Sequence, residues 1–217
     1  MRALRSVEAS SELPVVPYPP APWRSRGSMW MAFFKADSPL KLPAGVSPVL
    51  LPNWVVLTIV RYLEGALQYD EFVIGSLVRQ GLRFGVYVNS IWVDDVASLW
   101  GGRRIWGLHK ELARFDWSGS SVSISDERGT IASLALEDAR FRSPPLWMLA
   151  PGFGQLDGRW AFSVGSMLAR LGRSRMHVQE WSERFPYRLN EPSRLGFVAG
   201  PMRVAAFAPK ILGPVEG

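Results

Sequence analysis

The segment WVVLTIVRYLEGALQYDEFVIGSLVRQGLRFGVYVNSIWV, residues 54–93, decides the fold class of this chain. It contains three apolar runs, at 54–63, 69–78 and 82–93, that are rich in β-branched and aromatic residues. Runs of this length and composition are typical of buried β-strands, and Gly81 separates the second run from the third. The segment therefore predicts three consecutive strands.

Strand signals recur on both sides of this segment. SSVSISDERGTIASLALEDARF (120–141) alternates apolar and polar residues around DERG, the pattern of a hairpin. Further strands are expected at 29–36, 160–170, 172–181 and 202–212. Ten or so strands with few long helices indicate an all-β or β-dominated α+β fold, built as a sandwich or a closed barrel.

Two glycine-rich pieces invite a different interpretation. GGRR (101–104) and GFG (152–154) could be phosphate-binding loops, but no βαβ alternation accompanies them. We therefore expect both to be turns.

Length and composition favour one domain. The chain has 217 residues, of which 47% are hydrophobic, and this is enough for one sizeable core. Residues 1–22, rich in proline and serine, are expected to form an irregular arm, and residues 23–217 a single domain. There is no signal-peptide pattern and no apolar run of membrane-spanning length, so we expect a soluble cytoplasmic protein without a membrane partner.

Charge and residue counts exclude several classes of function. The net charge is +6, but the arginines are scattered and no groove-reading motif accompanies them, so no nucleic-acid partner is expected. Cysteine is absent, which excludes disulfides and thiol catalysis. The two histidines, His109 and His177, lie far apart in the chain, so neither a metal nor another cofactor is expected.

The strand pattern stops at DDVASLWGGRRIWGLHKELARF, residues 94–115. Asp94 or Asp95 is a candidate N-cap for a short helix at 95–100. The glycine pair that follows is expected to end this helix, and residues 108–115 are expected to form a turn or a second short helix.

Lys110 is the most informative residue of this segment. It is one of only four lysines among 25 basic residues, and Trp106, Leu108 and Leu112 lie near it in the sequence. A lysine amine attacks a carbonyl only when it is neutral, and an apolar pocket disfavours the charged form. Lys110 is therefore either a desolvated nucleophile or a surface lysine beside Glu111, and the residues alone leave both alternatives open.

The same segment resembles a known active site. GGRRIWGLHKELA (101–113) resembles the segment of the acetoacetate decarboxylase family in which a Gly-Arg-Glu stretch leads to aromatic-Pro-Lys, and that lysine forms a Schiff base with a β-keto acid. YDE (69–71) resembles the family's Tyr-x-Glu, whose Glu is catalytic, and its spacing to Lys110 agrees without a gap. PAPWRSRGSMWMAFFKAD (20–37) looks like the N-terminal segment with an arginine that orients this Glu, and VQEWSERFPYRLNEPSRL (178–195) is similar to a late segment of the family.

The resemblance covers about residues 18–212 and implies both a fold and a site. The implied fold is a cone-like, closed β-barrel flanked by short helices, with the lysine inside, in a homo-oligomer. Lys110 would be the Schiff-base nucleophile, Glu71 the general acid/base, and Arg26 the residue that holds Glu71 or the substrate acid. Arg24 competes with Arg26 for this role.

Two residues depart from the family pattern. A second lysine often follows the nucleophile, but here the position holds Glu111, and His109 replaces the family's proline. Tyr69, Trp106, His109 and Glu111 are the candidate pocket-lining residues.

Two functions follow from these residues. The first is a lyase that acts on a keto acid or another small carbonyl compound through a lysine Schiff base, by decarboxylation or by aldol or dehydration chemistry. The alternative is a cyclase or ligand-binding protein that uses the same barrel for a polyketide-like hydrophobic molecule without a Schiff base.

Overall fold

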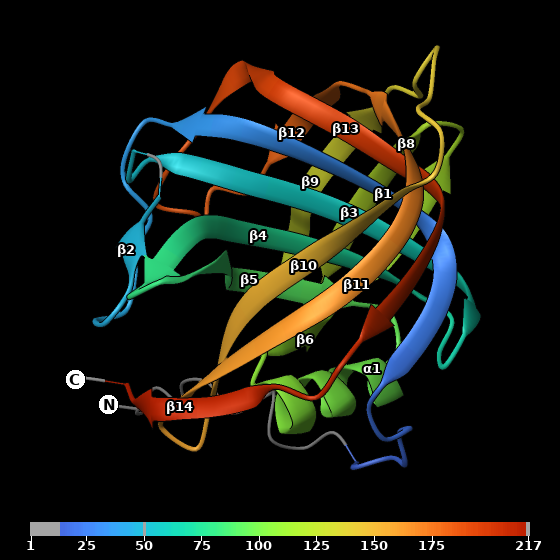
Figure 1. Cartoon of the computed structure of the whole chain (residues 1–217). Coiled ribbons are helices and arrows are strands. Elements are labelled where there is room, and N and C mark those ends of the chain that lie inside the picture. The colour runs from blue at the N-terminus through green and yellow to red at the C-terminus, as the bar shows by residue number, and fades with distance from the viewer. Residues whose placement is uncertain (1–13, 50, 216–217) are drawn as a thin grey trace, which may run out of the picture.

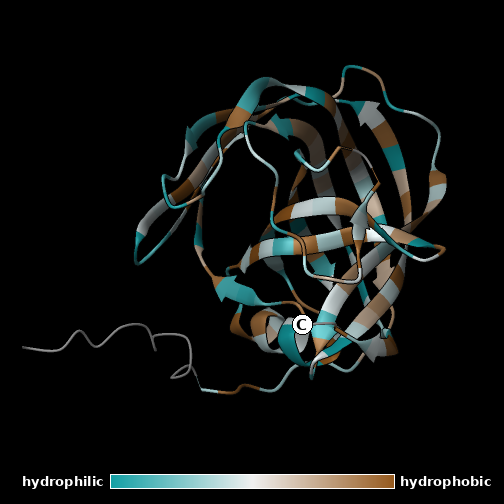
Figure 2. Cartoon of the chain, turned by 90° about the vertical axis from the view of Figure 1, so that its left-hand side faces the viewer, coloured by the Kyte–Doolittle hydropathy of each residue, from teal (hydrophilic) through white to brown (hydrophobic). Residues whose placement is uncertain are grey.

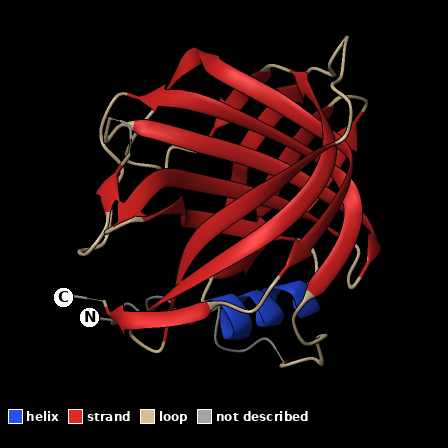
Figure 3. Cartoon of the chain, in the orientation of Figure 1, coloured by secondary structure: helices blue, strands red, loops and turns tan. Residues whose placement is uncertain are grey.

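The computed structural model describes residues 14–49 and 51–215, which consist mainly of β-strands (Figure 3). Two helical segments follow each other directly in the chain, the α-helix α1 (Val96–Gly101) and the π-helix η1 (Gly102–Trp106). They lie together at one end of the barrel (Figure 1). The β-dominated fold expected from the sequence is confirmed.

One large sheet contains ten strands of the described chain. These strands are β1 (Trp23–Ala36), β2 (Ser47–Pro48), β3 (Trp54–Gly65), β4 (Tyr69–Gln80), β5 (Arg83–Val93), β6 (Lys110–Leu112), β10 (Leu146–Leu156), β11 (Arg159–Arg173), β13 (Leu189–Ala206) and β14 (Lys210–Pro214).

Pairing between these strands closes a ring. It runs through β1, β3, β4, β5, β10, β11 and β13 and returns to β1. All the contacts in the ring are antiparallel except the short parallel contact between β5 and β10, which pairs Gly152 with Val86 and Phe153 with Tyr87. Closure removes the exposed edges that a sheet of this size would otherwise have.

A second sheet of four strands covers part of the barrel. Its strands, in sheet order, are β12 (Met176–Trp181), β9 (Gly129–Leu136), β8 (Ser121–Asp126) and β7 (Arg114–Ser118). The main core lies between this sheet and the outer face of the barrel, where Phe34, Leu57, Ile74, Ile124 and Leu134 are fully buried. Hydrophobic and hydrophilic residues alternate along several of the strands (Figure 2), as expected for strands whose two faces differ.

The interior of the barrel has its own apolar cluster. Buried Val60, Met167, Ala169, Ala199 and Met202 form it, and the partly buried Met29, Tyr62, Met148, Leu171 and Val204 pack against it. Strand alternation decides which side chains point inward, because neighbouring residues of a strand face opposite sides of the sheet.

Most of the expected strands are present, with shifted ends. The hairpin around DERG is β8 and β9, and the three runs of 54–93 are β3, β4 and β5. The strand expected at 29–36 begins earlier, at Trp23. The run 202–212 is divided between β13 and β14, and the strand expected at 172–181 begins only at Met176.

Three local predictions are wrong. GFG is not a turn but part of β10, where an added Cβ at Gly154 would lie 2.1 Å from the carbonyl oxygen of Trp106, so this glycine lets the strand approach the helical segment closely. GGRR is not a turn but part of the helical segment: the α-helix α1 ends at Gly101, as expected, and the π-helix η1 continues from Gly102. Residues 108–115 form β6 and the start of β7, not a turn or helix.

The described part of the expected arm, residues 14–22, has no helix or strand and packs on the barrel. Trp100 donates its indole N–H to the carbonyl of Pro14 at 3.0 Å, and Trp23 donates to that of Pro19 at 2.8 Å. Residues 1–13 lie outside the described residues, and the division into arm and domain stays a prediction.

Candidate active site

Lys110 begins the short strand β6, directly after the helical segment. Gly107 ends that segment in the left-handed conformation, with a φ of 65°, and an added Cβ there would lie 2.3 Å from a backbone oxygen of Gln155. Only glycine fits this turn. The chain then pairs in parallel with β5, so that Lys110 is the partner of Ile91. The turn therefore decides where the lysine enters the sheet.

The side chain of Lys110 is buried against Glu71. Lys110 is 3% exposed and Glu71 9% exposed, and the Nζ atom donates to Oε2 of Glu71 at 2.7 Å. The two residues are 39 positions apart in the chain, and sheet pairing brings them together: Glu71 is opposite Val93 in β4 and β5, and Val93 is opposite Leu112 in β6. Among the described residues, Lys110 and Glu71 are the only buried residues with a charged side chain.

Ser98 is the second polar partner of the amine. Its Oγ atom accepts a hydrogen bond from Nζ at 3.0 Å. Asp95 caps the helix α1 by accepting from the backbone N–H of Ser98 at 2.6 Å, which orients the first turn. Of the two expected N-cap candidates, Asp94 and Asp95, the structure shows Asp95 in this role. The cap also holds Ser98 in place beside the amine of Lys110.

Two tyrosines complete the surroundings of the amine. The Nζ atom lies 5.0 Å from the centre of the Tyr69 ring, and this ring lies 4.6 Å from that of Tyr62. Burial raises the pKa of both phenols well above the usual value, and the negative charge of Glu71 raises each further. Both hydroxyls are therefore neutral around the amine.

Gly102 leaves room for the methylene groups of the lysine. A Cβ at this position would lie 2.5 Å from both Cδ and Cε of Lys110. The glycine pair of the sequence is thus explained by packing, since an added Cβ at Gly101 would lie 2.4 Å from the ring of Trp23.

Comparison with known proteins identifies the family. The family model described as acetoacetate decarboxylase (ADC) matches residues 10–136, more than half of the chain. The chain belongs to the acetoacetate decarboxylase family. No curated protein sequence matches the chain at a significant level.

Solved structures agree with this family fold. The acetoacetate decarboxylase from Legionella pneumophila is 16% identical, with 98% of each chain covered and a TM-score of 0.67. The enduracididine biosynthesis enzyme MppR, solved with pyruvate, is 14% identical, with 96% of each chain covered and a TM-score of 0.68. An acetoacetate decarboxylase-like enzyme from Sphingomonas wittichii is 12% identical over 89% of this chain and 94% of the other, with a TM-score of 0.56.

Of the residues expected from the acetoacetate decarboxylase pattern, three come together. Lys110, Glu71 and Tyr69 form one buried group, in which the amine contacts the carboxylate directly at 2.7 Å and lies 5.0 Å from the centre of the Tyr69 ring.

Glu111, at the position of the family's second lysine, faces away from this group. Successive residues of β6 point to opposite sides of the sheet, so Glu111 shares the face of Trp92 and not that of Lys110. Its carboxylate accepts from Arg128 at 2.7 Å and is partly exposed. The expectation that Glu111 lines the pocket is not supported by this geometry, and its charge is directed away from the amine.

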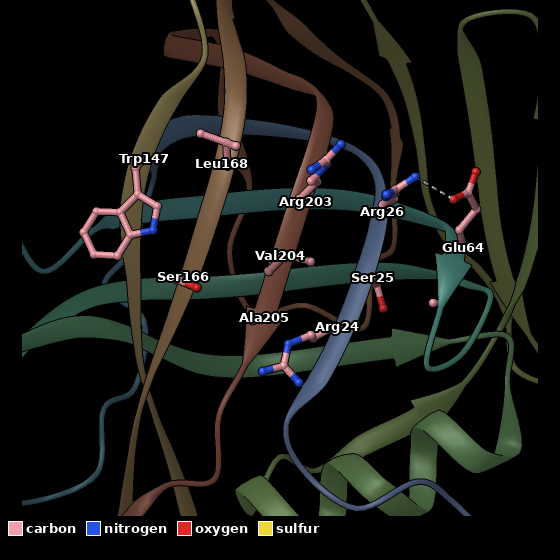
Figure 4. Close-up of a pocket in the computed structure, with 11 residues that line it drawn as sticks. Arg24, Ser25, Arg26, Glu64, Trp147, Ser166, Leu168, Arg203, Val204 and Ala205 are labelled. Carbon is pink, nitrogen blue, oxygen red and sulfur yellow. Dashed lines mark hydrogen bonds and ion pairs between the residues drawn. The ribbon is translucent and has the colours of Figure 1, made fainter.

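The arginine of the acetoacetate decarboxylase pattern is not beside Glu71 either. Arg24 and Arg26 occupy the exposed face of β1, and Arg26 donates to Glu64 at 3.4 Å with 58% of its side chain exposed. Both line a groove of about 400 Å³ that also contains Trp147 and Arg203 (Figure 4). Arg26 therefore contacts Glu64 and not Glu71 in this structure, and the position expected for an arginine that orients Glu71 is not seen.

Trp106 and His109 lie close in sequence to the lysine but have other surroundings. Trp106 is 7% exposed, donates its indole N–H to the carbonyl of Phe207 at 2.8 Å, and packs edge-on against Trp23. His109 is exposed and lines a separate groove with Arg103. Trp106 therefore fixes the helical segment, and His109 faces outward.

Sequence reasoning missed Ser98 and Tyr62. The sequence indicated that Ser98 lies in the first turn of a helix, because it is the third residue after the expected cap at Asp95. Nothing in the sequence indicated that this helix packs beside Lys110. Tyr62 could have been found only with the register of β3 and β4, which pairs it with Tyr69.

The described residues contain no group of three or more His, Cys, Asp or Glu that could hold a metal ion. No helical segment in this part of the chain has the length and apolar character that a bilayer crossing needs.

Proposed function

We propose that this protein is a lyase that acts on a keto acid or a related small carbonyl compound through a Schiff base at Lys110. The observation that carries the proposal is the buried pair of Lys110 and Glu71, held in a barrel of the acetoacetate decarboxylase family. A buried ion pair is a weak contributor to stability, because desolvation offsets much of its attraction. Its retention inside a barrel is therefore better explained by chemistry.

Glu71 is the acceptor for the proton that Lys110 must lose. With 2.7 Å between Nζ and Oε2, the proton can pass directly from the ammonium to the carboxylate. The pair then becomes a neutral amine and a carboxylic acid, which a low-dielectric site tolerates better than two separated charges. The neutral amine is the nucleophile that attacks the carbonyl carbon.

The Schiff base then serves as an electron sink. The amine adds to the carbonyl, water leaves, and a protonated iminium forms. With a β-keto acid, the bond to the carboxylate breaks, its electron pair moves into the iminium, and carbon dioxide and an enamine result. A proton then adds to the enamine carbon, and water releases the ketone and the amine. The structural neighbour MppR was solved with the keto acid pyruvate, which supports this class of substrate.

The test is chemical trapping of the imine. The protein is incubated with acetoacetate or pyruvate and borohydride, and the modified lysine is located by peptide mass spectrometry. We expect one adduct, on Lys110, and none in Lys110→Ala. Lys210→Ala is the matched control because Lys210 is exposed, and it should be trapped as the wild type is. Glu71→Gln should reduce trapping at least about 100-fold, the usual contribution of a positioned base.

Adducts spread over all four lysines, or none, would reject the Schiff base. The remaining function would then be the cyclase or ligand-binding alternative, in which the methionine-rich interior holds a hydrophobic molecule without a covalent bond.

A further inference from the structure

A series of hydroxyl groups leads away from the reactive amine. An ammonium can only donate, so Ser98 Oγ, 3.0 Å from Lys110 Nζ, accepts from it and keeps its own proton free to donate. Tyr69 lies beside them, with its ring centre 5.0 Å from Nζ and 4.6 Å from the ring centre of Tyr62. Burial raises the pKa of both phenols, and hydrogen bonding from Ser98 to Tyr69 and from Tyr69 to Tyr62 partly offsets this rise. Because each hydroxyl has one proton, the series has a single direction: Lys110 to Ser98, Ser98 to Tyr69, and Tyr69 to Tyr62.

Three separate elements hold this series in place. Ser98 is fixed by the capped first turn of α1, where it is 0% exposed. Tyr69 and Tyr62 face each other across β4 and β3, with ring centres 4.6 Å apart. Tyr69 is 8% exposed. Ser98 and Tyr69 are thus shielded from bulk water, while Tyr62, at the end of the series, is partly buried.

The two phenols stay neutral in this position. Burial raises the pKa of Tyr62 and of Tyr69, and the nearby charge of Glu71 adds to the effect. A tyrosinate is therefore excluded at neutral pH. The hydroxyls can still move a proton if each one receives a proton as it gives one away, because no charge then builds up on either ring.

Tyr62 is the member that adjoins the barrel interior. It packs against the apolar cluster around Tyr69, Val93 and Leu99, and equally against the interior cluster that contains Met167 and Met202. A substrate bound to Lys110 and extending into the interior would pass along this side chain.

We propose that Tyr62, supplied through Tyr69 and Ser98, is the acid that protonates the enamine carbon of a substrate bound to Lys110. This proposal rests on the proposed function. The enamine N–H gives its proton to Ser98, Ser98 gives one to Tyr69, Tyr69 gives one to Tyr62, and Tyr62 gives one to the carbon. The enamine C=C–N–H becomes the imine C–C=N, with a new C–H bond, and every hydroxyl ends with one proton as it began. Water then hydrolyses the imine.

The experiment uses acetone as a probe, because a Schiff base of acetone with Lys110 exchanges its methyl protons with solvent through the enamine, and the slower exchange with Lys110→Ala gives the background from enolisation in solution. The rate of deuterium incorporation in heavy water is followed by NMR, and imine formation is measured separately by borohydride trapping. We expect Tyr62→Phe to retain trapping within about twofold and to slow exchange at least about tenfold, since a positioned acid contributes at least that much. Ser98→Ala should slow exchange similarly, and the double variant should be no slower than the worse single variant because both break one series.

Tyr87→Phe is the matched control. Tyr87 belongs to a different cluster, with Phe153 and Trp160, and its loss should leave both measurements unchanged. Melting temperatures of all the variants identify any that fail to fold, and Ser98→Ala and Tyr62→Phe test the series independently.

The outcomes separate the two proposals. If the wild type is not trapped, the Schiff base itself is rejected, and the series of hydroxyls with it. If trapping is retained but Tyr62→Phe and Ser98→Ala exchange as fast as the wild type, only the role of Tyr62 is overturned. A Tyr62→Phe variant that loses trapping as strongly as exchange also overturns it, because the residue would then act on imine formation.

Discussion

Replacing Lys110 by methionine tests whether the buried pair is as isolated from water as its geometry indicates. Methionine is similar in shape to the lysine stem but carries no charge, so Lys110→Met leaves the carboxylate of Glu71 without its cation. The side chains of Lys110 and Glu71 are only 4% and 11% exposed, so little water can compensate. Removing one member of such a pair costs about 3–5 kcal/mol.

This loss is large enough to measure directly. For a chain of this length, each kcal/mol corresponds to about 2–4 °C, so the melting temperature of Lys110→Met should fall by about 6–20 °C. Thermal unfolding followed by circular dichroism at neutral pH measures this loss.

The double variant Glu71→Leu, Lys110→Met provides the control. It replaces both charges by apolar groups, and such replacements are neutral or stabilising by about 1–4 kcal/mol. We expect it to recover the loss of the single variant, although it can form no Schiff base. If Lys110→Met unfolds at the wild-type temperature, the pair is hydrated or unformed in solution, and burial cannot be the reason for its chemistry.

Three further predictions concern the surroundings of the site and the second sheet. An added Cβ at Gly102 would lie 2.5 Å from carbons of Lys110, so Gly102→Ala should displace the amine and reduce borohydride trapping at least about tenfold. Burial raises the pKa of Asp126, but hydrogen bonds from Arg184 and Arg128 and the charge of Arg184 outweigh this effect and leave the pKa below its usual value. Its stabilising effect is therefore complete above about pH 3.9 and lost as the pH falls through the lowered pKa, so Asp126→Asn should lower the melting temperature at neutral pH and match the wild type in acid. Arg26→Ala should leave trapping within about twofold, because its side chain is 58% exposed on the outer face of β1.

Each of these predictions has an outcome that contradicts it. Gly213→Ala is the control for Gly102, since no atom lies within 4 Å of its added Cβ, and equal trapping in both variants would remove the packing argument. A deficit in Asp126→Asn that persists unchanged in acid would show that the charge of Asp126 is not its cause. A large loss in Arg26→Ala would show that this arginine reaches the site in solution.

Local features of the site were predictable from short stretches of sequence. The N-cap at Asp95 and the hairpin around DERG each depend on residues within a few positions of one another. The lysine at position 110 was recognisable because it lies among large apolar residues and in a segment that resembles a family motif. Such signals do not depend on how distant parts of the chain pair.

The register of the strands decides on which face of the sheet each candidate side chain lies, and short stretches of sequence do not show it. Arg26 adjoins a shift in register between β1 and β3, and another shift between β1 and β13 follows directly after Gly27. Because side chains alternate with a period of two, one such irregularity changes the face on which an arginine lies. For the same reason, the side chains of Lys110 and Glu111 point to opposite faces of the sheet, although the two residues are adjacent in the sequence.

The sequence by itself determined that this chain is β-rich, that a short helix begins after Asp95, and that one lysine lies in an apolar segment, because these properties follow from composition and local spacing. Only the tertiary structure decided that the amine of Lys110 meets Glu71, Ser98 and the ring of Tyr69. These groups come from β4, β6 and α1, and the closure of the barrel and the register of its strands bring them within hydrogen-bonding and ring-contact distance.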